Sequence, residues 1–573
     1  MPLWSQNAVF CEKGGCLKQD SLFAFSEIKY CLFSFKNIFF VKIIYIIKLY
    51  SLIEIIYVCC SCCLIEKYKL TIYNMVFKKS LDQLLIEASE SGEHTLKRTL
   101  GPGNLIALGI GAIIGAGLFV RTAAAAADHA GPAVTLGFIL AAIGCALAGL
   151  CYAEFASMIP IAGSAYTYSY ATIGEVVAWV IGWDLVLEYA LGAATVSIAW
   201  SEYLNKLLQT FGISIPYEFC HSPFQVSTGG VYGIMNLPAL FIMAVVTFVL
   251  IRGIEESATI NNMMVILKVA IVIAFITIGW TYINPSNHIP YIPENVGETK
   301  LVNGEIGFWQ YLTADHFGKF GWSGIISSAG VVFFAFIGFD AVSTAAQEAK
   351  DPKKDMPIGM LVSLAICTVL YVLFAHVLTG VANYKEFETA GKEASVAYVI
   401  DTYMNNYHWL SILVTVAILA GFTSVILVML LGQSRVFFSM SKDGLIPRIF
   451  SDLHPKFRTP YKSNLIFLLF GGIFSAFVPG DVVGDMTSIG TLFAFSLVCI
   501  GVLILRKTDP DRHRPFKTPL MPFVPILGVV VCTTMMIGLG RHNWERLLIW
   551  MAIGFVIYFT YSIKNSVIRK AQQ

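Results

Sequence analysis

Charged side chains are scarce in this chain of 573 residues, since Asp, Glu, Lys and Arg together make up only 13% of it. Ordinary soluble globular domains carry about 25%, so the composition excludes that class. Hydrophobic residues make up 56% and the mean hydropathy is +0.70. The net charge of +2 is too small to indicate a nucleic-acid partner. The sequence also lacks the metalloprotease pattern H-E-x-x-H and the phosphate-binding pattern G-x-x-x-x-G-K-[ST].

The 13 cysteines indicate neither a disulfide framework nor a metal site. Seven of them lie in residues 1–74, where the run CCSCC at 59–63 lacks the paired C-x2-C spacing of a zinc ribbon. The others are scattered, mostly through apolar segments, where cysteine behaves as a small hydrophobic residue. We therefore expect no metal and no cofactor.

Long apolar segments fill the chain from residue 104 onward and leave no room for a folded soluble domain. A membrane-spanning helix needs about 20 mostly apolar residues, and the sequence predicts about twelve such spans. They begin near Asn104, Val134, Val176, Ile234, Ala258, Trp322, Ile358, Tyr407, Asn464, Met486, Met521 and Asn543. The predicted fold class is therefore an all-α integral membrane protein embedded in the lipid bilayer.

Lysine and arginine gather in the connections that follow even-numbered spans. The clearest cases lie at 350–354, 442–462 and 506–517. Because positively charged short loops resist translocation, these loops are predicted to be cytoplasmic. Both termini of a multi-pass protein of the cell membrane would then lie on that side.

Residues 1–74 differ in character from the rest of the chain. Their apolar run at 39–64 is interrupted by Lys42, Lys48 and Glu54, and three ionisable residues weigh against stable insertion. At Met75 the sequence changes to a charged amphipathic leader. We hypothesise that Met75 is the true start and that 1–74 is translated upstream sequence; the alternative is an interfacial anchor.

Two glycine-interrupted apolar segments occupy matching places in the two halves of the chain: GIGAIIGAGLFV at 109–120 and VVFFAFIGFDAVSTA at 331–345. Unpaired peptide groups are costly in lipid, so a helix unwinds only where those groups meet protein, water or ligand. Such a pair of interrupted spans is the best sequence indication of a transporter binding site. The alternative for the first segment is a G-x-x-x-G helix-packing face formed by Gly111 and Gly115.

The two predicted breaks offer complementary dipoles. Freed N–H groups at Gly115–Gly117 suit a carboxylate, whereas freed carbonyls at 335–337 suit an ammonium group. A molecule that carries both groups on one carbon is an α-amino acid. The rings of Phe336 and Phe339 either close over it or serve ordinary packing. The predicted substrate-binding residues are Ile114, Gly115, Ala116, Gly117, Ala335, Phe336, Ile337, Phe339 and Asp340.

Four runs together resemble the amino acid–polyamine–organocation (APC) superfamily, and within it the cationic amino acid transporter (CAT) family and its bacterial relatives. They are the segment at 109–120, CYAEFASMIPIAGSAYTY at 151–168, GWDLVLEY at 182–189 and FIGFDAVSTAAQEAKDPKKDMP at 336–357. The resemblance implies a LeuT-type fold of two inverted five-helix repeats plus two C-terminal helices, which makes 12 transmembrane helices. It also implies a secondary active permease that works by alternating access.

On this basis the chain divides into four parts. Residues 1–74 are the doubtful extension and 75–103 a cytoplasmic segment. Residues 104–506 form the ten-helix transport core, and 507–573 contribute two more helices and a cytoplasmic tail.

Three ionisable residues within spans carry the expected mechanism, because buried charges in membranes are functional by default. The resemblance implies that Lys268 occupies the place of a sodium ion between the first and eighth helices, which predicts sodium independence. It also implies that Glu188 exchanges a proton; the alternative is a satisfied helix-packing carboxylate. Asp340 either orients the second break or meets a cationic substrate side chain.

Other polar residues rank lower as candidates. Glu154 has either a gating or a solvated role near the cytoplasmic end, and Asp184 pairs or caps within the third span. Thr423 and Ser424 either touch substrate or hydrogen-bond to other helices.

The predicted function is proton-coupled, sodium-independent transport of α-amino acids, with protons as the coupling ion. Two rivals remain: a polyamine or organic-cation carrier, and an amino-acid sensor that does not transport. An intramembrane enzyme is disfavoured, because no nucleophile–base pair or metal spacing occurs in the spans. Which amino acids are carried, symport versus exchange, and any accessory subunit are left open by the sequence.

Overall fold

The computed structural model describes residues 77–79, 100–159, 164–227, 229–253, 258–296, 318–344, 346, 349–388, 395–404 and 407–572. The chain divides into two units, Met1–Met75 and Val76–Gln573, and the following sections concern the second. The hypotheses about residues 1–74 and a start at Met75 lie outside the described residues, as does most of the segment 75–103.

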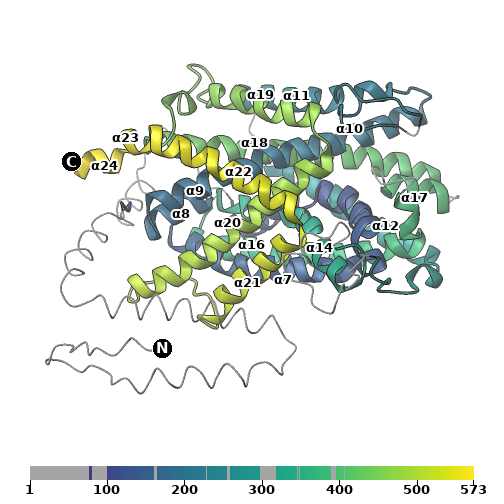
Figure 1. Ribbon diagram of the computed structural model, residues 1–573, viewed down its shortest axis with the longest axis horizontal. Helices are drawn as coiled ribbons and strands as arrows, with labels where there is room; N and C mark the ends of the chain where they lie inside the picture. The colour runs from purple at the N-terminus through teal and green to yellow at the C-terminus, as the bar shows by residue number, and fades with distance from the viewer. Residues whose placement is uncertain are drawn as a thin grey trace, which may run out of the picture. The chain divides into compact units, whose positions relative to one another are not determined.

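Within the described part, the chain is built from helices and their connections (Figure 1). The principal helices are α5 (Pro102–Ile113), α7 (Val134–Met158), α9 (Glu175–Val186), α10 (Gly192–Thr210), α11 (Leu237–Arg252), α12 (Ala258–Gly279), α14 (Gly321–Phe333), α16 (Pro352–Val381), α18 (His408–Lys442), α19 (Tyr461–Phe477), α20 (Gly480–Thr508), α21 (Phe523–Gly538) and α22 (Arg541–Ile557). Short helical segments extend several of them: η2 (Gly117–Arg121), α6 (Thr122–Ala125) and η3 (Ala126–Ala130) follow α5; η5 (Leu187–Leu191) joins α9 to α10; η9 (Phe334–Phe336) and α15 (Ala341–Thr344) follow α14.

Eight described helices are long and apolar enough to cross a membrane, and four shorter apolar helices accompany them. One of the eight, Gly117–Met158, has 42 residues and would be about 63 Å long if straight, twice the thickness of a bilayer core. The turn at Gly131–Ala133 divides it, so its first part completes the span begun by α5 and its second part is α7. Counted in this way, the described helices provide the twelve spans that the sequence predicts.

The packing of these spans confirms an internal repeat. If the first five spans correspond in order to the next five, each contact in one repeat should have a counterpart in the other. The contact of α5 with α16 corresponds to that of α14 with α7. Likewise, α5 with α12 corresponds to η9 with α20, and α10 with α11 corresponds to α18 with α19. The pairs α7–α16, α10–α18 and α11–α19 map onto themselves, and Figure 1 shows α11 and α19 side by side. Because each repeat contains an odd number of spans, the second repeat must be inverted in the membrane.

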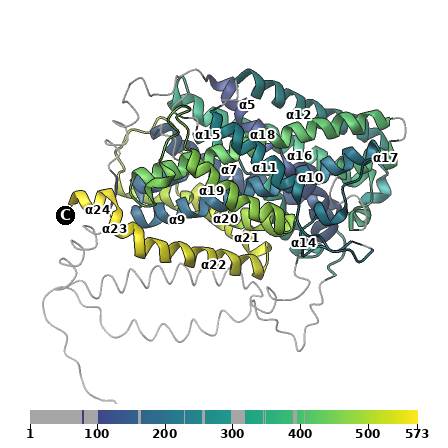
Figure 2. The same ribbon diagram turned by 90° about the horizontal axis from the view of Figure 1, so that it is seen from above.

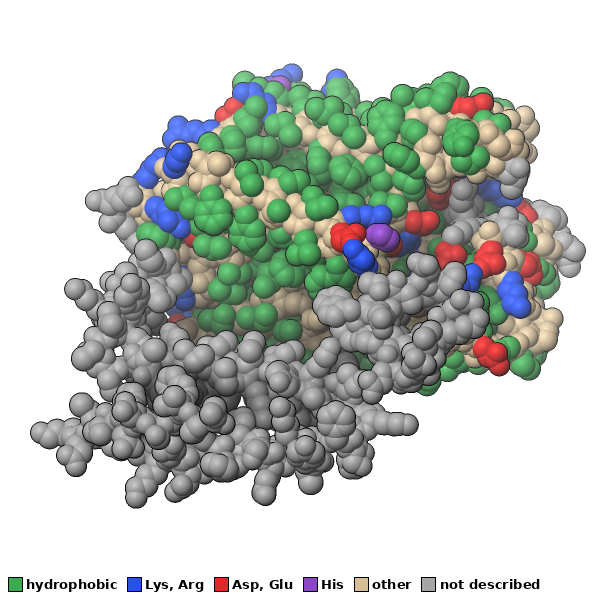
Figure 3. All heavy atoms as spheres, in the orientation of Figure 1, with side chains coloured by type: hydrophobic (Ala, Val, Ile, Leu, Met, Phe, Trp, Pro, Cys, Tyr) green, Lys and Arg blue, Asp and Glu red, His purple; other side chains and the backbone are tan. Residues whose placement is uncertain are grey.

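An apolar surface surrounds the helix assembly. Large hydrophobic side chains are exposed on its outer helices, including Phe241, Phe248, Ile266 and Leu469. Figure 3 shows a broad hydrophobic surface on the visible face, with Lys and Arg side chains gathered at the end near the C-terminus. Exposed apolar helix faces of this extent belong against lipid.

Candidate functional site

The first span breaks where glycine was expected to break it. Helix α5 ends at Ile113, and Ile114 is extended, with φ −73° and ψ 102°. The N–H groups of Gly115, Ala116 and Gly117 form no hydrogen bond with any residue that the structure describes. The chain becomes helical again in η2. These three buried N–H groups can therefore accommodate a negatively charged group.

The second break lies between η9 and α15. Ile337 is extended, with ψ 136°, and Gly338 has a φ of +110°, a conformation that side chains disfavour. A methyl group at Gly338 would also lie 3.0 Å from the carbonyl oxygen of Ala112. Glycine is therefore required at this position for both its backbone conformation and its approach to α5.

The two breaks lie against each other. A methyl group at Gly117 would sit 2.5 Å from the backbone nitrogen of Ala335, so the absence of a side chain allows the two backbones to meet. The buried Tyr371 hydroxyl of α16 lies 2.9 Å from the carbonyl oxygen of Ile113 and 3.0 Å from that of Ala335. Tyr371 thus joins both breaks and already donates toward one of the carbonyls predicted to hold ammonium. Tyr371 could not be predicted from the sequence, because tyrosine in an apolar span gives no distinctive signal.

The two candidate aromatic residues are packed within the protein. The ring of Phe336 contacts those of Phe138 and Tyr371, and the ring of Phe339 contacts those of Tyr152 and Phe495. Both side chains are fully buried. In this structure they form part of the core, and closure over a substrate stays a prediction.

Lys268 lies between the helices that the sequence analysis named. Its Nζ atom donates to the carbonyl oxygen of Gly111 in α5 at 2.8 Å, and its side chain is 2% exposed. The lysine side chain packs against Gly421 of α18, where an added methyl group would lie 2.8 Å from the lysine Cε atom. A buried ammonium therefore braces the first helix beside the eighth.

Glu188 and Asp340 are fully buried and lie beside each other. Asp340 accepts hydrogen bonds from the hydroxyls of Tyr189 at 2.7 Å and Ser164 at 3.4 Å. Neither carboxylate oxygen of Glu188 has a hydrogen-bond partner in good geometry among the described residues. Glu188 sits in the π-helical segment η5, and such segments are frequent at functional sites.

Two of the lower-ranked candidates behave differently from expectation. Asp184 is buried, but within the described residues neither of its oxygens has a hydrogen-bond partner, so the expectation that it pairs or caps is wrong. Thr423 bonds to the Leu419 carbonyl of its own helix. The Ser424 hydroxyl is buried without a described partner, which leaves both of its interpretations open.

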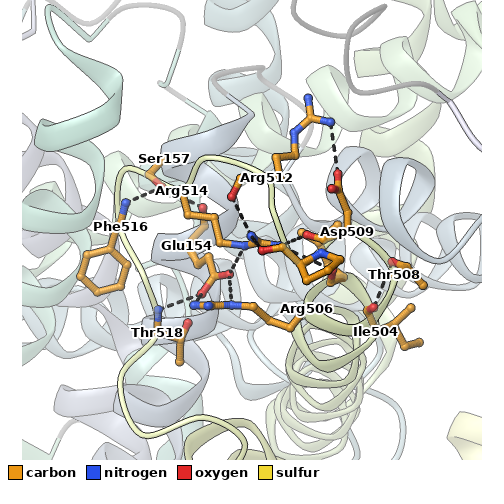
Figure 4. Close-up of polar contacts among 12 residues, drawn as sticks. Glu154, Ser157, Ile504, Arg506, Thr508, Asp509, Arg512, Arg514, Phe516 and Thr518 are labelled. Atoms are coloured by element: carbon orange, nitrogen blue, oxygen red, sulfur yellow. Dashed lines mark hydrogen bonds and ion pairs between the residues drawn. The ribbon is translucent and has the colours of Figure 1, made fainter.

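Glu154 is fully buried near the end of α7 and is held by the last turn of α20 and the connection that follows it (Figure 4). Arg506 binds both of its oxygens at 2.9 Å, Arg514 lies at 3.2 Å, and the backbone N–H of Thr518 donates at 2.8 Å. The solvated role considered for Glu154 is therefore wrong, because the carboxylate is enclosed and neutralised.

Arg121 is an intramembrane charge that the sequence analysis missed. It lies in η2 just beyond the first break, is 4% exposed, and forms ion pairs with Asp481 at 3.1 Å and with Asp485, both in α20. A charged residue directly after the apolar run GLFV was an available signal. It ties the outer half of the first span to the tenth.

Two interrupted spans whose breaks meet, with buried charges beside them, are typical of a polytopic membrane transporter. The chain belongs to the amino acid permease family, whose model matches residues 100–558. It is therefore a multi-pass amino acid permease of the cell membrane and not an enzyme.

Several characterised relatives cover most of the chain. It is 43% identical over 491 residues to the branched-chain amino acid permease BcaP of Bacillus subtilis (strain 168). The matched residues make up 86% of this chain and 98% of the relative. It is 38% identical to the methylthioribose transporter of the same organism, over 86% of this chain and 99% of the relative. The vacuolar cationic amino acid transporter 4 of Arabidopsis thaliana is 31% identical, over 76% of this chain and 68% of the relative. The predicted superfamily membership is confirmed.

Proposed function

We propose that this permease carries α-amino acids by alternating access, coupled to protons and independent of sodium. The observation that carries the proposal is the meeting of the two breaks: Gly117, the last of three residues whose N–H groups lack a partner among the described residues, lies against Ala335. The substrate carboxylate would bind those N–H groups. Its ammonium would bind between the carbonyls of Phe336 and Ile337 and the oxygen of Tyr371.

The energetics of this arrangement are sufficient. Micromolar affinity requires about −8 kcal/mol, and each hydrogen bond to a charged group contributes about 1.5–3 kcal/mol before ordering costs. Three N–H groups on the carboxylate and two or three oxygens on the ammonium reach that range. No bond in the substrate needs to be made or broken.

The proposed cargo is a branched-chain or other small apolar amino acid. The printed function of the relative at 43% identity supports this choice. The surroundings of the break support it as well: Val425 is the nearest side chain to Gly115, and the rings of Phe374 and Phe422 flank Phe119. An apolar wall of this kind favours an aliphatic substrate side chain over a charged one.

Glu188 and Asp340 form the proposed proton site. Two adjacent buried carboxyl groups cannot both carry a charge without a nearby cation, so one proton is shared between them. Loading and release of that proton as the site changes its access would couple transport to the pH gradient. Lys268, bonded to Gly111, supplies the fixed positive charge that a sodium ion would otherwise provide.

The proposed orientation places both termini in the cytoplasm. Residues 77–79, the connection after α18 and the last helix α24 (Val567–Gln572) meet at one end of the molecule. Basic residues are concentrated in that connection, which the positive-inside rule assigns to the cytoplasm.

The test is uptake of labelled leucine into proteoliposomes, with and without an inward proton gradient and in the absence of sodium. We expect accumulation only with the gradient, and we expect Glu188→Gln to abolish accumulation while Glu294→Gln, at an exposed position, behaves as wild type. A Glu188→Gln protein that still accumulates leucine with unchanged proton dependence would disprove the role of Glu188. Binding without uptake would instead indicate a sensor.

A second candidate cargo is a thiosugar, favoured by the similarity to the methylthioribose transporter. Methylthioribose has neither a carboxylate nor an ammonium group, so it would leave the free N–H groups without an ionic partner. A competition panel of the twenty amino acids, putrescine and methylthioribose separates the possibilities. Strong competition by a compound without a carboxylate would overturn the amino-acid assignment.

A further inference from the structure

A further buried carboxyl group lies one helical turn before Glu188. Asp184 of α9 is 1% exposed, and neither of its oxygens has a hydrogen-bond partner among the described residues. Asp184 and Glu188 are four positions apart, a spacing that places two side chains on the same face of a helix. Both Asp184 and Asp340 lie beside Glu188. The proposed function uses Glu188 and Asp340 and leaves Asp184 without a role.

No cation neutralises these three carboxyl groups within the part of the chain that the structure describes. Glu175, in the first turn of the same helix, shows the usual alternative. It is 2% exposed, and it accepts hydrogen bonds from the Tyr558 hydroxyl at 2.9 Å and from Arg569 Nε at 2.7 Å. A buried carboxylate without such partners costs several kcal/mol, and a carboxyl group avoids that cost by keeping its proton. Asp184 is therefore expected to be a neutral acid.

Helix α20 packs closely against this face of the third span, and Figures 1 and 2 show α9 and α20 side by side. At Gly490 of α20, an added methyl group would lie 3.1 Å from Asp184 Oδ1 and 2.9 Å from the Cβ atom of Leu187. The next residue, Thr491, lies beside Glu188. The absence of a side chain at Gly490 therefore allows α20 to enclose the Asp184 carboxyl group without placing a bulky group against it.

Tyrosine hydroxyls supply further polar atoms around the carboxyl groups. The hydroxyl of Tyr152 in α7 lies beside Asp340 and Glu188, is fully buried, and has no hydrogen-bond partner among the described residues. Tyr189 donates to Asp340 at 2.7 Å. A hydroxyl can both donate and accept a hydrogen bond, so it can stabilise a neighbouring carboxyl group in either protonation state. Buried carboxyl chains of this kind in membrane spans mark proton pathways.

From this arrangement we propose that Asp184 is a second proton carrier of the permease, in series with Glu188. The inference rests on the proton coupling at Glu188 and Asp340 in the proposed function. In the proposed orientation α9 begins at the cytoplasmic side with Glu175, so Asp184 lies about 6 Å nearer to the cytoplasm than Glu188.

The proposed relay has two steps. The neutral Asp184 gives its proton to water that enters from the cytoplasm in the inward-open state, and it becomes a carboxylate. The protonated Glu188 then transfers its proton to Asp184, which leaves Glu188 ionised and Asp184 neutral again. One proton reaches the cytoplasm, and the number of protons on the two residues falls by one.

The first test measures the proton on Asp184 without substrate or a gradient. Infrared spectra of the full-length protein in lipid nanodiscs, recorded in H2O and D2O at neutral pH, resolve the C=O stretching bands of protonated carboxyl groups. We expect Asp184→Asn to lose one such band. Asp509→Asn, whose carboxylate is 41% exposed, should keep the wild-type spectrum. If Asp184→Asn fails to fold, Asp184→Glu should retain the band at a shifted frequency.

The second test separates proton transfer from substrate binding in proteoliposomes. We expect Asp184→Asn to lower the initial rate of uptake driven by a proton gradient about 100-fold, because a positioned proton-transfer group contributes at least that much. Counterflow of labelled against unlabelled leucine needs no net proton release and should be unchanged. Asp184→Glu, which restores a carboxyl group, should recover uptake.

Two results would overturn the assignment of Asp184. One is a wild-type set of infrared bands in Asp184→Asn, with Asp184→Glu equally without effect. The other is an equal loss of counterflow and proton-driven uptake, which would indicate a packing role. These failures count against Asp184 alone. If wild-type protein shows no proton-driven accumulation of leucine, the proposed function fails, whatever the infrared spectra show.

Discussion

Replacing Gly117 by alanine tests the meeting of the two breaks directly. The added methyl group would lie 2.5 Å from the backbone nitrogen of Ala335, whereas ordinary contact begins at 3.4 Å. Because the Cα atom of Ala335 would lie closer still, the two segments must separate by more than about 0.9 Å. The obstructing atoms belong to the backbone of a broken helix and cannot rotate away, unlike a flexible side chain.

Two effects follow from that separation. Overpacking of a close-packed core costs about 1–3 kcal/mol of stability. A displacement of about 1 Å between binding groups lowers the rate of a positioned process by about 100-fold. We expect Gly117→Ala to fold with a reduced melting temperature in detergent and to lose nearly all leucine uptake in proteoliposomes.

A graded series gives the controls. At Gly115 a methyl group would meet only the side chain of Val425, at 3.3 Å, and at Gly103 it would meet nothing within 4 Å. Gly115→Ala should be intermediate and Gly103→Ala close to wild type in both assays. Wild-type uptake and melting temperature in Gly117→Ala would show that the two backbones do not meet as described.

Two further substitutions address the buried charges. Lys268→Met keeps the length of the apolar side chain but removes the 2.8 Å hydrogen bond to the carbonyl oxygen of Gly111. Because a hydrogen bond from a charged group contributes about 1.5–3 kcal/mol, we expect uptake to fall about 10- to 100-fold. Undiminished uptake would contradict the bracing role of Lys268. Glu154→Gln leaves Arg514, whose side chain is 1% exposed, without its counter-charge, so thermal unfolding should show a loss of about 3–5 kcal/mol. Glu545→Gln, in an exposed pair with Arg541, is the matched control and should change little; equal effects of the two substitutions would refute the importance of burial.

Much of the fold could be predicted because its causes are local. A run of about 20 apolar residues specifies a span, so the twelve spans follow from composition along the chain. The first break could also be predicted: Gly115 and Gly117 weaken a helix wherever they occur. The second break follows from Gly338, whose positive φ is a conformation that glycine accepts most readily.

The candidate site was only partly predictable. The backbone positions at 114–117 and 335–340 could be named, because unwinding depends on residues adjacent in sequence. Tyr371 could not be found in this way, since its hydroxyl reaches Ile113 across 258 positions of sequence. Arg121 was missed although its charge was visible, and the enclosure of Glu154 depends on Arg506, 352 positions away.

The sequence by itself determined that this is a helical membrane protein with two interrupted spans, because hydrophobicity and glycine content act through each segment's own interaction with lipid. Only the tertiary structure decided which groups meet: Lys268 with Gly111, Glu154 with its arginines, and Glu175 with Arg569, separated by 394 positions. A buried charge can be neutralised by any suitable partner, and the helix packing of the whole chain selects which partner comes within reach.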